Sequence, residues 1–189
     1  MIFTVAQSIA DNKASVIYHC LQRMFKYGTS VLHNINDEYI FQFNKIYKKA
    51  ANEAHFYIEI LRFNENANGF LTARIEPDNN IIYMIIDHFN DRLHCENFLI
   101  YDVRRNIAYI HMNNNTAFFY NDYNNELLKQ LDDFSDNEND IQNLWIRFYN
   151  TIAIKERVNY KCQINMLPLK YRKYLPELPI KKGIPPNNN

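Results

Sequence analysis

Apolar residues change their spacing partway along the chain, and this limits the possible folds more than any other feature. Over about the first sixty residues they recur every three or four positions. From there to about residue 120 they come in short runs separated by polar turns. The first pattern is typical of amphipathic helices and the second of short strands. We therefore expect an α+β fold, with N-terminal helices followed by a sheet.

Two helices are expected before the change, over residues 11–27 and from residue 36 or 37 to about 57. Asp11 or Asn12 can cap the first helix, and Gly28 ends it. Residues 58–63 either continue the second helix or form a strand, which we expect to make a hairpin with residues 70–75. The turn between them ends at Gly69, a residue type that tolerates positive φ.

The rest of the sheet follows a third helix. This helix is expected over residues 81–93, and strands over 98–101, 107–112 and 116–120, which completes an antiparallel sheet of about five strands. A C-terminal helical segment is expected from about residue 139 to residue 157, with these apolar residues facing inward: Ile141, Leu144, Trp145, Phe148, Ile152 and Ile154. Residues 1–178 are thus predicted to be a single α+β domain, and the Pro/Asn-rich residues 179–189 a disordered tail.

Composition excludes several classes of protein. Only three glycines occur, which rules out a phosphate-binding Walker loop and a dinucleotide fingerprint. No apolar run reaches the length of a membrane span and no signal peptide is recognisable, so we expect a cytoplasmic protein without a membrane partner. The three cysteines, Cys20, Cys95 and Cys162, have no metal-ligand spacing and are expected to be reduced and buried. Neither a metal nor another cofactor is predicted.

A basic, tyrosine-bearing segment at the C-terminal end is the first candidate for a function. The net charge is zero, with 21 basic and 21 acidic residues, but basic residues outnumber acidic ones from residue 155 onward. Cations pair with phosphates and tyrosine rings stack on unpaired bases, so the segment suits nucleic acid. The predicted contacts are Lys155, Arg157, Lys170, Tyr171, Arg172, Lys173 and Tyr174. The alternative is an ordinary surface helix with its tyrosines packed inward.

Charged residues at the ends of apolar segments are the second candidate. Each of these residues follows or ends a strand or a helix: Arg62, Glu76, Asp78, Arg92, Asp102, Arg104 and Arg105. Such residues meet at one edge of a sheet, either as an ion-pair network or as a polar cleft for an anion such as a phosphodiester.

Several phrases together carry a resemblance to a known family. They are EAHFYIEILRF (53–63), ARIEPDNNI (73–81), DHFNDRL (87–93), IYDVRR (100–105) and the long stretch from LWIRFYN to YLPEL (144–178). The chain closely resembles a bacterial domain of unknown function found in proteins associated with DNA repair or DNA metabolism. Members are encoded beside radical-SAM proteins, and some are fused to a uracil-DNA glycosylase-like domain. Where the family has a tryptophan in its closing motif, this chain has Arg172.

The resemblance implies a DNA repair or DNA metabolism accessory protein. It would bind single-stranded or damaged DNA through the cations above, including Arg62, Arg92 and Arg105, and act with a radical-SAM or glycosylase-like partner. Two alternatives belong to other classes. One is an enzyme acting on DNA or nucleotides through His55, Glu76, His88 and Asp102. The other is a protein–protein adaptor without DNA affinity.

Overall fold

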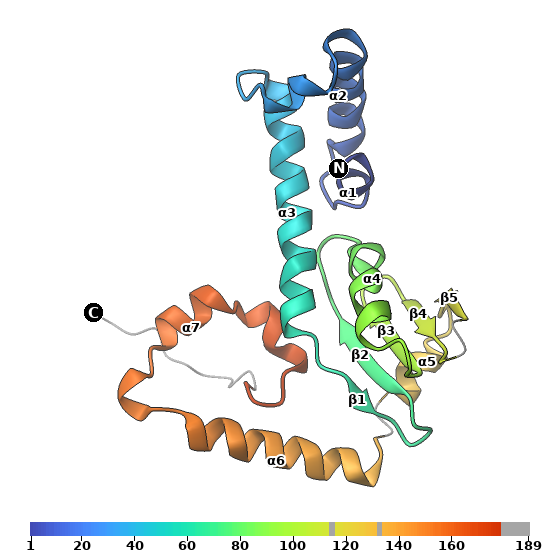
Figure 1. Ribbon diagram of the computed structural model, residues 1–189, viewed down its shortest axis with the longest axis vertical. Helices are drawn as coiled ribbons and strands as arrows, with labels where there is room; N and C mark the ends of the chain where they lie inside the picture. The colour runs from blue at the N-terminus through green and yellow to red at the C-terminus, as the bar shows by residue number, and fades with distance from the viewer. Residues whose placement is uncertain (114–115, 132–133, 179–189) are drawn as a thin grey trace.

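The computed structural model describes residues 1–113, 116–131 and 134–178 (Figure 1). Its helices are α1 (Ile2–Ala6), α2 (Lys13–Tyr27), η1 (Thr29–His33), α3 (Glu38–Ile60), α4 (Ile82–Arg92), α5 (Glu126–Gln130), α6 (Asp136–Ile152), η2 (Lys155–Arg157), α7 (Tyr160–Met166) and η3 (Leu169–Tyr174). Its strands are β1 (Asn64–Glu65), β2 (Leu71–Ile75), β3 (Phe98–Asp102), β4 (Ile107–His111) and β5 (Ala117–Asn121). The predicted α+β class is confirmed. The predicted tail, residues 179–189, lies outside the described residues.

The two N-terminal helices form as predicted and pack on each other. α2 ends at Gly28, which has a φ of 78°. α3 begins after Asp37, whose side chain accepts hydrogen bonds from the first free backbone N–H groups of the helix. A small core lies between α1, α2 and the first half of α3, and it includes Val5, Val16 and Phe43. α3 then continues as a long helix to the sheet, so it connects the two halves of the molecule (Figure 1).

The sheet has the strand order β1-β2-β3-β4-β5 within the described residues, and its neighbours are antiparallel except for one pair. β2 and β3 run parallel, because α4 carries the chain back across the sheet between them. The prediction of an all-antiparallel sheet is therefore wrong at this pair. Residues 58–60 also belong to α3 rather than to a strand, and the hairpin with β2 is reduced to the two residues of β1.

The main core lies on the face of the sheet that α4 and the end of α3 cover. Ile75, Ile85, Phe89 and Ile100 are each 0% or 1% exposed there. The opposite face carries a smaller core around Tyr101 and is partly covered by α5. Because side chains alternate along a strand, β2 sends Ile75 to the first face and Thr72 and Arg74 to the second.

The C-terminal segment differs most from prediction. α6 forms, but it ends at Ile152 and not at residue 157. The six apolar side chains expected to face inward are between 40% and 64% exposed: Ile141, Leu144, Trp145, Phe148, Ile152 and Ile154. The helix instead turns polar residues toward β1. The Glu138 carboxylate accepts from the Glu65 backbone N–H (3.0 Å), and the Gln142 amide donates to Asn64 Oδ1 (3.2 Å).

After α6 the chain returns to α3 and docks on it through η3. The ring of Tyr171 lies 4.5 Å from that of Phe56 and 5.3 Å from that of Tyr57 (centroid distances), and Leu175 is buried beside them. Two of the cysteines expected to be buried, Cys95 and Cys162, are exposed, and Cys20 is buried. Among the described helices, none is long and apolar enough to cross a membrane.

Candidate functional site

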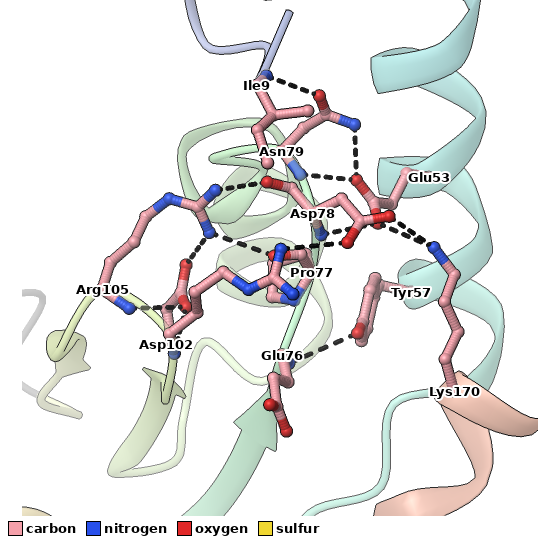
Figure 2. Close-up of polar contacts among 11 residues, drawn as sticks. Ile9, Glu53, Tyr57, Glu76, Pro77, Asp78, Asn79, Asp102, Arg105 and Lys170 are labelled. Carbon is pink, nitrogen blue, oxygen red and sulfur yellow. Dashed lines mark hydrogen bonds and ion pairs between the residues drawn. The ribbon is translucent and has the colours of Figure 1, made fainter.

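The loop after β2, residues 76–79, lies at the centre of a network of polar contacts (Figure 2). Since β2 and β3 are parallel and Ile75 pairs with Asp102, their carboxyl ends emerge at the same edge of the sheet. The loop therefore lies beside the β3–β4 turn, with the end of α3 on its other side. This is the edge at which the sequence predicted that charged residues would meet.

Glu53 of α3 holds the loop from one side. One of its carboxylate oxygens accepts from the Asp78 backbone N–H at 2.9 Å. The other accepts from the backbone N–H of Asn79 at 2.8 Å and from its side-chain amide at 2.6 Å. The Asn79 side-chain oxygen accepts in turn from the Ile9 backbone N–H (3.0 Å), so this buried residue connects the N-terminal helices to the sheet.

Arg105 and Asp102 hold the loop from the other side. The Arg105 guanidinium donates to the backbone oxygens of Pro77 (3.3 Å) and Asp78 (2.6 Å) and to the Asp102 carboxylate (2.8 Å). Asp102 is 0% exposed. Burial raises the pKa of Asp102 above its ordinary value, although the hydrogen bonds from Arg105 act in the opposite direction.

The C-terminal segment reaches the same loop through two lysines of η3. The Lys170 ammonium donates to Asp78 Oδ2 (2.8 Å), and Lys173 pairs with Glu76. The hydrogen bond from Lys170 holds the pKa of Asp78 below its usual range. The hydrogen bond to Glu76 raises the pKa of Lys173. Burial alone would lower the pKa of Lys170, but its contacts with Asp78 and Tyr171 outweigh this and raise it.

These contacts make the loop cluster an internal ion-pair network, one of the two alternatives left open by the sequence. The histidines assigned to the enzyme alternative lie outside it. The His55 ring pairs with Glu59 on the surface of α3 (3.2 Å), and His88 and Arg92 are exposed on α4. Within the described part of the chain, no group of three or more His, Cys, Asp or Glu residues is placed to hold a metal ion.

A cavity of about 400 Å³ opens next to this network, on the second face of β2. Cations from three separate segments line it: Arg62 follows α3, Arg74 lies on β2 and Lys173 lies on η3. The remaining lining residues are Asn64, Thr72, Leu131, Phe134, Gln142, Tyr174, Leu175 and Pro176. None of the lining residues in the described part of the chain is acidic, although Glu177 and Glu76 beside the lining pair with Arg62 and Lys173.

Each cation has a defined position. The Arg62 guanidinium donates to Glu177 Oε1 (3.0 Å) and lies 5.8 Å from the ring centre of Trp145. Arg74 and Thr72 point to the same face of β2 because they are two positions apart. Lys173 lies beside Tyr174, whose hydroxyl contacts Glu76 Oε2 (3.4 Å). Burial raises the pKa of Tyr174, so the phenol stays protonated at neutral pH.

The other predicted nucleic-acid contacts are distributed differently. Arg172 is 6% exposed and donates to the backbone oxygens of Leu167 (2.9 Å) and Gln163 (2.8 Å). Tyr171 packs on α3, and Arg157 is exposed after α6. The backbone of Lys155 lies in η2, but its side chain is outside the described atoms. Within the described part of the predicted basic segment, Arg172 and Tyr171 therefore stabilise the fold, whereas Arg157 lies on the surface.

Sequence reasoning missed Arg74 and Gln142 as lining residues. The sequence could have identified Arg74, because polar and apolar residues alternate over positions 71–76 and Arg74 is one of the polar residues. That alternation marks a polar face of β2. Gln142 carried no signal, since its side of α6 was expected to face solvent.

The fold and cavity define an α+β protein with a cationic pocket at the junction of its sheet and C-terminal segment. A family model described as a domain of unknown function, DUF4130, matches residues 11–177, and the chain belongs to this family. Comparisons with curated proteins and with solved structures give no match.

Proposed function

We propose that this protein is a cytoplasmic accessory protein of DNA repair or DNA metabolism that binds single-stranded or damaged DNA. In this proposal the cavity receives a phosphate of the DNA strand. The observation that carries it is the convergence of Arg62, Arg74 and Lys173, from three separate segments, on one cavity whose described lining has no acidic residue. The resemblance of the sequence to DNA repair and DNA metabolism proteins supports the choice of DNA as the ligand.

The chemistry of the lining suits a phosphodiester. Arginine pairs with phosphate through two parallel hydrogen bonds, and lysine adds a compact charge. Asn64, Thr72 and Gln142 add neutral side chains that can hydrogen-bond to phosphate or sugar oxygens. Cavities for small ligands range from about 300 to 1,000 Å³, so the cavity is large enough for a nucleotide unit.

Arg62 and Lys173 already have carboxylate partners in the free protein. Glu177 holds Arg62, and Glu76 holds Lys173. An arriving phosphate has to compete with these carboxylates, so binding exchanges one partner for another and leaves the cations in place. Because the slope depends on the number of phosphates neutralised, one phosphate in the cavity should give a logarithmic salt slope of about −0.7 on single strands.

A titration of the full chain against labelled single-stranded and duplex DNA at two salt concentrations tests the proposal. We expect binding that favours the single strand, and at least about a tenfold loss in Arg74→Gln. Lys49→Gln, which removes the same charge from an exposed position on α3, is the matched control and should bind like the parent. Equal affinity in Arg74→Gln and Lys49→Gln, or no binding at low salt, would refute the role of the cavity.

The proposal includes an enzyme partner, such as a radical-SAM or uracil-DNA glycosylase-like protein, because the resemblance implies one. The enzyme alternative has less support, since His55 and His88 lie apart from Glu76 and Asp102. Turnover of a DNA substrate by the purified chain, lost in His55→Ala, would restore that alternative.

A further inference from the structure

The apolar face of α6 is the largest feature of the molecule that the cavity does not explain. Ile141, Leu144, Trp145, Phe148 and Ile152 recur every three or four residues and are between 40% and 64% exposed. They form one stripe about 16 Å long. Monomeric proteins rarely expose a contiguous apolar surface of this kind, and such surfaces mark sites of association. We refer to these five residues as the α6 stripe.

The α6 stripe cannot turn inward in this fold. The adjacent side of the helix is held by Glu138 and Gln142, which hydrogen-bond to β1, and by Tyr149, whose hydroxyl accepts from the Gln163 amide (3.3 Å). Rotating the helix to bury the stripe would break these contacts and leave the Glu65 N–H without its acceptor. Figure 1 shows α6 at the edge of the molecule, with the sheet and α7 on one side of it only.

Charge along the segment indicates what covers the stripe. Acidic residues precede it, with Asp136 and Asp140 in the first turns of α6. Basic residues follow it, with Lys155 and Arg157 in η2 on either side of Glu156. A second copy laid antiparallel would bring the acidic end of each α6 against the basic end of the other, whereas a parallel copy would bring like charges together. This self-complementarity is what a two-fold interface requires, because both copies use the same surface.

We propose that the α6 stripe binds the α6 stripe of a second copy of this chain, with the two helices antiparallel and the two-fold axis between Trp145 and Phe148. The five side chains expose on the order of 100 Å² each, so two copies would cover about 1,000 Å², near the lower limit for a specific interface. We therefore expect a reversible dimer that dissociates on dilution.

Sedimentation velocity of the full chain over a concentration series tests this proposal. The parent protein should move from monomer to dimer as concentration rises. Phe148→Asp, which places a charge in the middle of the stripe, should weaken association by more than about tenfold. Leu144→Glu is a second stripe variant, and Asn143→Asp is the control, since Asn143 is exposed on the opposite side of the same helix. Circular dichroism checks that each variant is folded.

Charge reversals test the antiparallel arrangement. Asp140→Lys reverses a charge at the acidic end of α6 and Arg157→Glu reverses one at the basic end, so each should weaken the dimer, and added salt should weaken the dimer of the parent protein. A monomer at every concentration, or a dimer unaffected by Phe148→Asp and Leu144→Glu, would overturn the proposal. The result is independent of the DNA-binding proposal, because Arg74→Gln should leave association unchanged.

Discussion

α2 and α6 have the same kind of sequence and different surroundings. Both are helices of about four turns with a continuous apolar stripe. The stripe of α2 packs on α3, where Val16 and Cys20 are nearly inaccessible to solvent. The stripe of α6 is open to solvent along its length. The comparison teaches that apolar spacing predicts a helix and the direction of its apolar side, whereas the partner on that side depends on the rest of the fold or on another chain.

The largest expected effect comes from the same substitution in the two settings. Phe43, which α2 covers, is 0% exposed, whereas Phe148 is 51% exposed. Phe43→Ala should reduce the free energy of unfolding by about 3–5 kcal/mol, because it removes buried contacts and leaves a cavity. Phe148→Ala should change it by less than about 0.5 kcal/mol in the dilute monomer. Urea denaturation at low protein concentration measures both. Similar losses would mean that α6 is covered within the monomer.

The second prediction concerns the connection between the helical half and the sheet. Glu53→Ala removes the acceptor of three hydrogen bonds from Asp78 and Asn79 and leaves these donors buried. We expect a loss of about 3 kcal/mol in unfolding free energy. Glu59→Ala on the same helix removes an exposed carboxylate and is the matched control, with less than about 0.5 kcal/mol expected. An equally small effect at Glu53 would contradict the role of the loop network.

The spacing of apolar residues along the chain was sufficient to predict the positions of most helices and strands. Helix spacing placed α2, α3 and α4 within a few residues, and Gly28 and Gly69 marked real breaks, both with positive φ. The cap expected for α2 was wrong, since the Asn12 side chain at its N-cap position makes no capping hydrogen bond. The relative direction of neighbouring strands could not be predicted from the spacing of apolar residues. The parallel pair β2–β3 depends on α4 crossing the sheet, which is a matter of tertiary arrangement and leaves no mark in the spacing of either strand.

The candidate site was predictable to a smaller extent. Asp102 and Arg105 were expected at one edge of the sheet and pair there, and Glu76 lies in the adjoining loop with its carboxylate on Lys173. Arg62 and Arg92 were expected at the same edge, but Arg62 pairs with Glu177 and Arg92 is exposed on α4. Glu53, which accepts from Asp78 and Asn79 of the loop, was not assigned to that edge, because a carboxylate in a helix gives no sign that it will accept a backbone N–H group 25 residues away. Arg172 was expected to contact DNA, but its guanidinium is bonded to the carbonyls of its own segment.

The third prediction follows from that position of Arg172. Arg172→Ala removes the donors to Leu167 and Gln163 and opens space under η3, so we expect a loss of about 2 kcal/mol in unfolding free energy. Its effect on DNA should be limited to the loss of folded protein. The affinity and the salt slope of binding by the folded fraction should stay those of the parent, whereas Lys173→Gln, which removes one of the cations around the phosphate, should lower the affinity and make the slope smaller. A reduced slope in Arg172→Ala would return that residue to the contact surface.

The smallest expected effect tests how the C-terminal segment is held on the rest of the molecule. Asp78→Asn removes the ion pairs to Lys170 and Arg104, both partly exposed to solvent, so we expect a loss of about 1 kcal/mol at pH 7 after allowing for screening. Asp87→Asn on the exposed side of α4 is the control. Urea denaturation over a pH series measures the difference between parent and variant.

The difference in unfolding free energy between the parent and Asp78→Asn should depend on pH, and the direction follows from the lowered pKa of Asp78. The hydrogen bond from Lys170 lowers the pKa of Asp78 in the folded protein below the ordinary value of 3.8, so between the two pKa values the unfolded chain binds more protons. The stabilisation is therefore complete well above pH 3.8 and is lost as the pH falls through the lowered pKa. The raised pKa of Asp102 acts in the opposite direction but is common to parent and variant, so it cancels in the difference. A difference that persists at low pH would show that Asp78 stabilises the loop by something other than its charge.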